Sequence, residues 1–234
     1  MVAPRFGNRA RKDAEVEDRM MDRIRDKLNK FSSITYDTTK SWLCQLLNSG
    51  ETEFLTGFIT MVFEKAASEP HICALYARLI TELRASFPHL DTELHRIFDE
   101  FILIFEEARV EPDIGTAQYT AFVEQRERRK YRRGYASFIG EVASLGVLSA
   151  ADVIATCNKV LDGIAAAKVT DGNQGLCEEY ASCLTILTKR CGALILPDAG
   201  DLSSRVNGAM DRTNAPGLSN KARFALMDVM DMFA

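Results

Sequence analysis

Phe54 to Tyr76 reads FLTGFITMVFEKAASEPHICALY, and this stretch decides the fold. Its apolar side chains recur at spacings of three and four residues, which is the period of an α-helix. They form one stripe before Pro70 and another that begins after it: Phe54, Leu55, Phe58, Ile59 and Val62, then Ile72, Leu75, Leu79, Ile80 and Leu83. Pro70 cannot continue the first helix, but it suits the first turn of the next. The stretch therefore predicts a helical hairpin.

The same helical spacing of apolar residues recurs on both sides of this hairpin. The further stripes cover residues 20–31, 38–48, 91–105, 119–145, 153–164, 176–191, 202–210 and 224–230. Strand-like alternation of apolar and polar residues is not found in any of them. The sequence therefore predicts an all-α protein.

Residues that favour helix starts and breaks support these boundaries. Asp91 follows Pro88 and is expected to cap one helix, and Ser219 is expected to cap the last. Ser149 and Asp152 have the Ser-x-x-Asp spacing of a capping box. Residues 112–115 run from a proline to a glycine, which predicts a loop between the two halves of the chain.

Together the stripes make about ten helices in about five antiparallel pairs, each pair spanning roughly 35 to 50 residues. A single pair of this size cannot bury its own apolar face and must pack on its neighbours. We therefore expect stacked HEAT-like repeats that form a curved α-solenoid. Residues 15–234 are predicted to be this single domain, and residues 1–14 a basic disordered tail.

Composition narrows the classes of protein that the chain can belong to. It has 234 residues, of which 47% are hydrophobic, so it can bury a packed core. Its net charge of −4 does not favour nucleic acid for the molecule as a whole, although a local basic patch remains compatible with it. No secretory leader and no apolar run long enough to span a membrane is found, so we expect a cytoplasmic protein without membrane contact.

The residues that usually carry enzyme chemistry are present but not arranged for it. The six cysteines lie mostly within apolar stripes and form no Cys-x-x-Cys pair, which predicts reduced, buried thiols. His71, His89 and His95 have no metal-ligand spacing with cysteines or carboxylates. Phosphate-binding and nucleophile-elbow motifs are also missing. We expect neither an enzyme nor a bound metal or cofactor.

One strongly basic segment predicts a local RNA contact. Six of eight successive residues in it are cationic: Arg126, Arg128, Arg129, Lys130, Arg132 and Arg133. Tyr131 and Tyr135 are interleaved with them, and a basic surface with aromatic rings is typical of single-stranded RNA binding. A solvated helix face is the alternative interpretation.

Four motifs, in order along the chain, resemble the middle domain of the translation initiation factor 4G family. The first is Leu28-Asn29-Lys30-Phe31, and the second runs from Val62 to Ala77 through Phe63-Glu64-Lys65-Ala66 and Ser68-Glu69-Pro70. The third is Arg132-Arg133 followed by Phe138-Ile139-Gly140-Glu141. The fourth is Arg223-Phe224 followed by Met227-Asp228-Val229. The four matches span about residues 20 to 231, which is nearly the whole chain.

This resemblance implies a non-enzymatic scaffold in translation initiation. Members of the family bind both lobes of the DEAD-box RNA helicase initiation factor 4A, stimulate its ATPase and unwinding activity, and contact mRNA. The resemblance places the helicase contacts at the two ends of the stack and, less closely, at the basic tail: Leu28, Asn29 and Lys30 at one end, Lys221, Arg223 and Asp228 at the other, and Phe6 in the tail.

Several of these assignments have an alternative. Leu28 occupies a stripe position, so core packing is its default role, and Asn29 also suits a local helix cap. Phe224 is expected to pack inside. The family's usual motif for a cap-binding protein, Tyr-x-x-x-x-Leu-apolar, is absent, so that partner would have to be recruited differently. The loop near residues 106–120 is also shorter than in the family.

Two other functions are compatible with the same fold. The first is an RNA-processing or translation-regulatory adaptor that binds a DEAD-box helicase without activating it. The second is a helical-repeat protein with unrelated partners, because one fold can carry many functions. The Leu28-Asn29-Lys30 and Phe138-Ile139-Gly140-Glu141 motifs favour the initiation branch.

Overall fold

The computed structural model describes the backbone of residues 7–50, 52–105, 117–198 and 200–233, and side chains within these ranges except for 7–17, 117–126, 128, 129 and 198. Over this part of the chain the protein forms ten α-helices and two short 3-10 helices. In chain order they are α1 (Gly7–Asn29), α2 (Tyr36–Leu47), α3 (Leu55–Ser68), α4 (Cys73–Ser86), α5 (Leu90–Phe101), η1 (Ile102–Phe105), α6 (Ala117–Ser144), α7 (Ala150–Lys168), α8 (Gln174–Ile195), η2 (Leu196–Asp198), α9 (Gly200–Ala209) and α10 (Asn220–Asp231).

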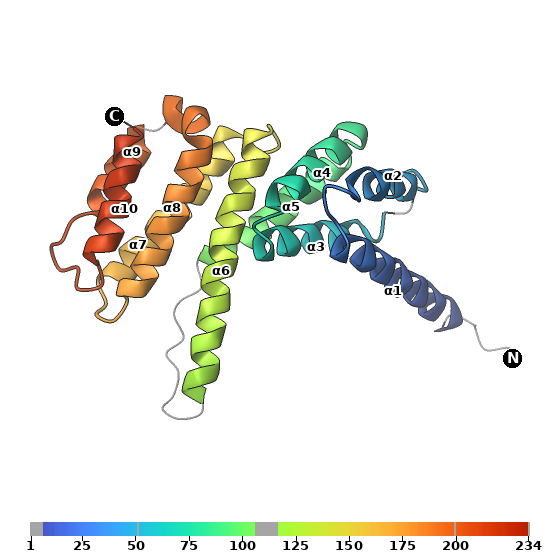
Figure 1. The fold of residues 1–234 in the computed structure, drawn as a ribbon, viewed down its shortest axis with the longest axis horizontal. Coiled ribbons are helices and arrows are strands. Elements are labelled where there is room, and N and C mark those ends of the chain that lie inside the picture. Colours follow the sequence, from blue (N-terminus) through green and yellow to red (C-terminus); the bar gives the residue numbers. More distant parts are fainter. Residues whose placement is uncertain (1–6, 51, 106–116, 199, 234) are drawn as a thin grey trace, which may run out of the picture.

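The helices stack in two layers, and the layer changes with each successive helix. In the first layer α1 packs on α3, α3 on α5, the following η1 on α7, and α7 on α9. In the second layer α2 packs on α4, α4 on α6, α6 on α8, and α8 on α10. The helix pairs therefore follow one another in chain order, and α1 and α10 lie at opposite ends of the molecule (Figure 1). This arrangement confirms the predicted all-α solenoid.

The hairpin at residues 54–76 forms as predicted, with a small difference at its turn. α3 ends at Ser68, but α4 begins only at Cys73, so Pro70 lies in the turn rather than inside the second helix. The amide of Ile72 donates to the carbonyl oxygen of Glu69 across 3.1 Å and closes the turn. Both apolar stripes face the common core, where Ile72 and Leu75 are partly buried and the other members are buried.

Two of the three predicted helix caps are confirmed. Ser149 and Asp152 form the reciprocal capping box at the start of α7, and the Ser219 hydroxyl accepts from the amide of Ala222 at the start of α10. Asp91 does not cap α5, which begins one residue earlier at Leu90. Its carboxylate instead accepts a hydrogen bond from Arg84 of α4.

The first helix begins closer to the amino terminus than the sequence predicts. α1 starts at Gly7, so it includes residues 7–14 of the predicted disordered tail. This segment holds Ala10, Lys12 and Ala14, and such residues lose little conformational entropy in a helix. Residues 1–6 lie outside the described part of the chain.

Three buried tyrosines join the layers by the same kind of hydrogen bond. Each lies on a second-layer helix and donates its hydroxyl to a backbone carbonyl of the first layer. The bonds are Tyr76 to Leu28 O at 3.2 Å, Tyr135 to Phe98 O at 3.3 Å, and Tyr180 to Phe105 O at 3.0 Å. Each acceptor is in the last turn of α1, α5 or η1, and the carbonyls of Leu28 and Phe98 also accept the backbone amides of Phe31 and Ile102. The tyrosines therefore hold the pairs in register.

α6 is the longest helix, with 28 residues, and its amino-terminal part extends beyond the neighbouring helices (Figure 1). Its carboxyl-terminal half packs against α3, α4 and α8. At Gly134 the contact is so close that an added Cβ would overlap the carbonyl oxygen of Ala67 on α3. Gly134 is therefore required for α3 and α6 to approach this closely.

We predict that Gly134→Ala destabilises the protein by about 1–3 kcal/mol, because the methyl group has to push α3 away from α6. Thermal unfolding followed by circular dichroism measures the effect. Gly192→Ala in α8 is the matched control, since an added Cβ there meets no atom within 4 Å. It should leave stability unchanged or raise it by about 0.5–1 kcal/mol. Equal melting temperatures for the two variants would contradict the close contact.

Candidate interaction surfaces

Three residues at the end of α1 are predicted to bind a helicase, and two of them have exposed side chains. Asn29 and Lys30 are exposed. Leu28 is only 1% exposed and lies on the same helix face as Ile24, inside the core. The prediction of a partner contact by the Leu28 side chain is therefore wrong, and its alternative role in core packing is confirmed.

The turn after α1 adds an exposed apolar residue that the sequence analysis missed. Ile34 is 91% exposed, although it lies between two helices with apolar stripes. The Thr35 hydroxyl donates to the carbonyl oxygen of Lys30 at 2.7 Å and accepts from the amide of Ser32 at 3.0 Å. These bonds fix the turn while the Ile34 side chain points away from the core. Ile34 lies between the apolar stripes of residues 20–31 and 38–48 and belongs to neither, and this position could have indicated its exposure from the sequence.

At the opposite end of the stack, α10 presents the second set of predicted helicase contacts. Lys221 and Asp228 are exposed and Arg223 is half-buried. The Lys221 ammonium pairs with Glu178 of α8 at 2.9 Å, so this end is tied to the preceding helix pair. We define the α10 surface as Lys221, Arg223, Phe224, Met227 and Asp228.

Phe224 was expected to pack inside, and this prediction is wrong. Its side chain is 60% exposed, and Met227 beside it is also exposed. The core-facing residues of α10 are instead Ala222, Leu226 and Val229. Phe224 is two residues from both Ala222 and Leu226, which places it on the opposite face of the helix.

The six cations of the segment predicted to bind RNA differ in exposure, and the side chains of three of them lie outside the described residues. Lys130 and Arg133 are exposed on α6. Arg126, Arg128 and Arg129 belong to the part of α6 that extends from the stack, and their side chains lie outside the described residues. Phe6, the predicted contact in the tail, also lies outside them.

Arg132 is not an RNA contact, because its side chain is buried. It is 4% exposed and pairs with Glu179 of α8 through an Nη1 to Oε1 contact of 2.9 Å. Its Nε also donates to the carbonyl oxygen of Ile104 in η1 at 2.9 Å, and its guanidinium lies over the Tyr180 ring. Arg132 therefore joins α6, η1 and α8.

The prediction that Tyr135 stacks on an RNA base is also wrong. Its ring is fully buried among Phe63, Phe101 and Phe105, and its hydroxyl is used in the bond to Phe98. Tyr131 is half-buried and packs against the core. Lys130 and Arg133 therefore remain as the exposed described cations of the predicted RNA surface.

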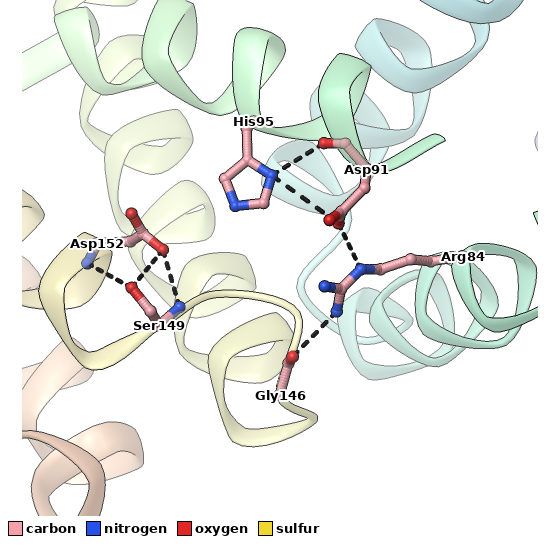
Figure 2. Close-up of polar contacts among 6 residues, drawn as sticks. All are labelled: Arg84, Asp91, His95, Gly146, Ser149 and Asp152. Atoms are coloured by element: carbon pink, nitrogen blue, oxygen red, sulfur yellow. Dashed lines mark hydrogen bonds and ion pairs between the residues drawn. The ribbon is translucent and has the colours of Figure 1, made fainter. Parts of the chain in front are cut away.

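A polar cluster between α4, α5 and the turn before α7 has a structural role (Figure 2). Arg84 bridges the Asp91 carboxylate and the carbonyl oxygen of Gly146, which it contacts at 3.0 Å. Gly146 has a φ of 75°, a conformation that favours glycine in this turn. The His95 Nδ1 lies 2.9 Å from the backbone oxygen of Asp91.

The hydroxyl of Ser149 in this cluster is not arranged for nucleophilic catalysis. It donates to the Asp152 carboxylate at 2.7 Å and accepts from the Asp152 amide at 3.2 Å, so it caps α7 (Figure 2). A catalytic serine would instead donate to a base such as histidine. Arg84 of the same cluster ties the start of α5 to the turn between α6 and α7.

The thiols are buried as predicted, except that Cys44 is half-buried. Burial raises the pKa of Cys157 to about 12 and that of Cys73 to about 11, and it raises the pKa of Cys183 further. A thiol with such a pKa is protonated at neutral pH and is a poor nucleophile. These cysteines therefore act as small apolar core residues.

The chain was compared with models of known protein families, and no family model matches it. Among the described residues, no helix is long and apolar enough to cross a membrane. The same residues contain no group of three histidine, cysteine or acidic side chains placed to hold a metal ion.

We predict that Arg132→Met lowers the free energy of unfolding by about 3–5 kcal/mol, because it leaves the Glu179 carboxylate buried without its cation. Adding Glu179→Met should recover part of this loss, since the double variant buries no unpaired charge. Urea unfolding of the two variants measures the difference. A double variant that is less stable than Arg132→Met would contradict this account of the pair.

Proposed function

We propose that the protein is a translation initiation scaffold that binds both lobes of the DEAD-box helicase initiation factor 4A and stimulates its ATPase and unwinding activities. The four-motif resemblance to the initiation factor 4G middle domain suggests this partner. The observation that carries the proposal is the exposure of large apolar side chains at both ends of the stack, Ile34 at one and Phe224 with Met227 at the other. Ile34 lies next to Asn29 and Lys30, and Phe224 lies among Lys221, Arg223 and Asp228.

Each of these ends has the composition of a small protein-binding site. An apolar side chain that is removed from water on binding supplies affinity, and polar neighbours supply orientation. The Ile34 turn is fixed by the hydrogen bonds of Thr35, so little conformational entropy is lost when a partner binds it. Because the two ends lie on opposite sides of the molecule, each can contact a different lobe (Figure 1).

Stimulation follows from binding both lobes at once. A scaffold that favours one relative arrangement of the lobes shifts the helicase population towards that arrangement. The size of the shift is limited by the difference in affinity between the productive and unproductive arrangements. Tyr76, Tyr135 and Tyr180 hold the helix pairs in register, so they also hold the spacing between the two end surfaces.

The helicase contact is tested with separately purified lobes of initiation factor 4A and the full chain. The resemblance assigns the α1 end to the C-terminal lobe and the α10 end to the N-terminal lobe. Ile34→Asp should weaken binding of the C-terminal lobe by about tenfold or more, since a hot-spot contact contributes on the order of 2 kcal/mol. Phe224→Asp should do the same for the N-terminal lobe. Isothermal titration calorimetry measures both.

Leu145→Asp is the matched control, because Leu145 is an exposed apolar residue directly after α6, in the middle of the stack. It should leave both affinities unchanged. The intact helicase should hydrolyse ATP faster when the wild-type chain is added and less so with either end variant. Binding without stimulation would favour the adaptor function, and no complex at micromolar concentration would overturn the proposal.

RNA contact by α6 is the second part of the proposed function. Lys130 and Arg133 are exposed cations near the part of α6 that extends from the stack. Each cation that contacts a phosphate releases condensed counterions from the nucleic acid and so makes binding dependent on salt.

The double variant Lys130→Glu and Arg133→Glu should bind RNA more weakly and with a flatter salt dependence. The slope of log affinity against log salt should fall by about 0.7 for each lost phosphate contact. Fluorescence anisotropy with a labelled RNA, measured over a salt series, gives this slope. Unchanged RNA binding at low salt would contradict a contact at this position.

A further inference from the structure

Trp42 on α2 holds two cationic side chains of α1 over its ring. The Arg23 Cζ lies 5.6 Å from the ring centre, and the Lys27 Nζ lies 5.8 Å from it. Arg23 and Lys27 are both exposed, while Trp42 is half-buried against the core. The ring therefore fixes the positions of two charges that face solvent. We call Arg23, Lys27 and Trp42 the Trp42 platform.

The charges around the platform are arranged by the helical period of α1. Arg19, Arg23 and Lys27 recur every fourth residue, so they lie along one face with about 6 Å of helix axis between successive charges. Asp18, Asp22 and Asp26 form a parallel row on the adjoining face, where Asp22 is paired with Arg25. No ion pair joins Arg23 or Lys27 to another described side chain, so both keep their positive charge available.

We propose that the Trp42 platform binds single-stranded nucleic acid. The cations of α1 contact successive phosphates, and a base stacks on the guanidinium of Arg23 or on the exposed part of the Trp42 ring. A row of cations beside aromatic surface is the combination that sequence-tolerant single-strand binders use. Because Trp42 already restrains Arg23 and Lys27, less conformational entropy is lost when a strand binds.

The aromatic ring favours a nucleic acid over an acidic protein segment. An acidic peptide needs cations alone, and it gains little from a flat ring beside them. A nucleotide gains from both, because its phosphate binds the cations and its base has a π-face that stacks on Trp or Arg. The platform uses none of the residues assigned to the Lys130 and Arg133 contact on α6, to the α1 end or to the α10 surface, so its own variants test it separately.

The experiment uses the full chain and a fluorescein-labelled oligouridylate of about 16 nucleotides. Arg23→Glu should weaken binding roughly tenfold at low salt, since it removes one phosphate contact and adds a repulsive charge. Arg25→Glu is the matched control, because it makes the same charge change on the opposite side of α1 and should alter affinity much less. An equal loss in the two variants would show a general charge effect and overturn the proposal.

A second measurement reports on the platform directly, because Trp42 is the single tryptophan of the chain. Unlabelled oligouridylate should quench its fluorescence over the same concentration range in which anisotropy shows binding. Trp42→Phe keeps an aromatic ring and should retain most of the affinity, whereas Trp42→Ala should lose it. Circular dichroism on both variants separates this loss from unfolding.

The remaining outcomes also decide the question. Binding that leaves Trp42 fluorescence unchanged would place the strand elsewhere on the protein and overturn the proposal. Quenching by polyglutamate equal to that by oligouridylate would make the partner an acidic peptide instead. A deoxythymidylate of the same length shows whether the 2′-hydroxyl contributes: equal affinity supports a site for either single strand, and weaker affinity supports one for RNA.

Discussion

Side chains of the second layer donate hydrogen bonds to backbone carbonyls at the carboxyl ends of the first-layer helices. Such a bond contributes about 1 kcal/mol and, because its geometry is directional, it fixes how the two layers lie on each other. Tyr76, Tyr135 and Tyr180 make these bonds to α1, α5 and η1, where the carbonyls of Leu28 and Phe98 also accept a backbone amide. Arg132 does the same for Ile104 and is itself neutralised by Glu179. The register of the stack depends on these donors.

Much of the fold could be predicted because helical periodicity is a local property. The stripes around Pro70, the capping box at Ser149 and the cap at Ser219 each need only neighbouring residues, and all are present. The role of Arg132 could not be read in this way, since its partner Glu179 lies 47 residues away and only the packing of α6 on α8 brings them together. A run of charges does not reveal that one member faces inward.

The errors at the end surfaces have a related physical cause. A hydrophobic residue near a helix stripe is expected to be buried, but within the described part of the chain α10 packs on α8 and α9, and no further helix covers its outer face. Phe224 lies on that face and is exposed for this reason. Leu28 shows the opposite case, because the motif that suggests a partner contact also contains the residue that packs into the core. Whether Phe224 or Leu28 is exposed therefore depends on the helices packed around it, which its sequence motif does not specify.

Contacts between next-but-one helices determine how the molecule responds to force. In a stack of this kind a load applied across the two ends passes through a series of interfaces, and each takes up a small part of the deformation. α6 interrupts the series, because it contacts α3, α4, α7 and α8 together. Among the described helices, α1 and α2 pack least closely on their neighbours, whereas α10 packs extensively on α8. We therefore expect elastic compliance to be concentrated at the α1–α2 end, which yields to a load while the rest of the stack keeps its shape.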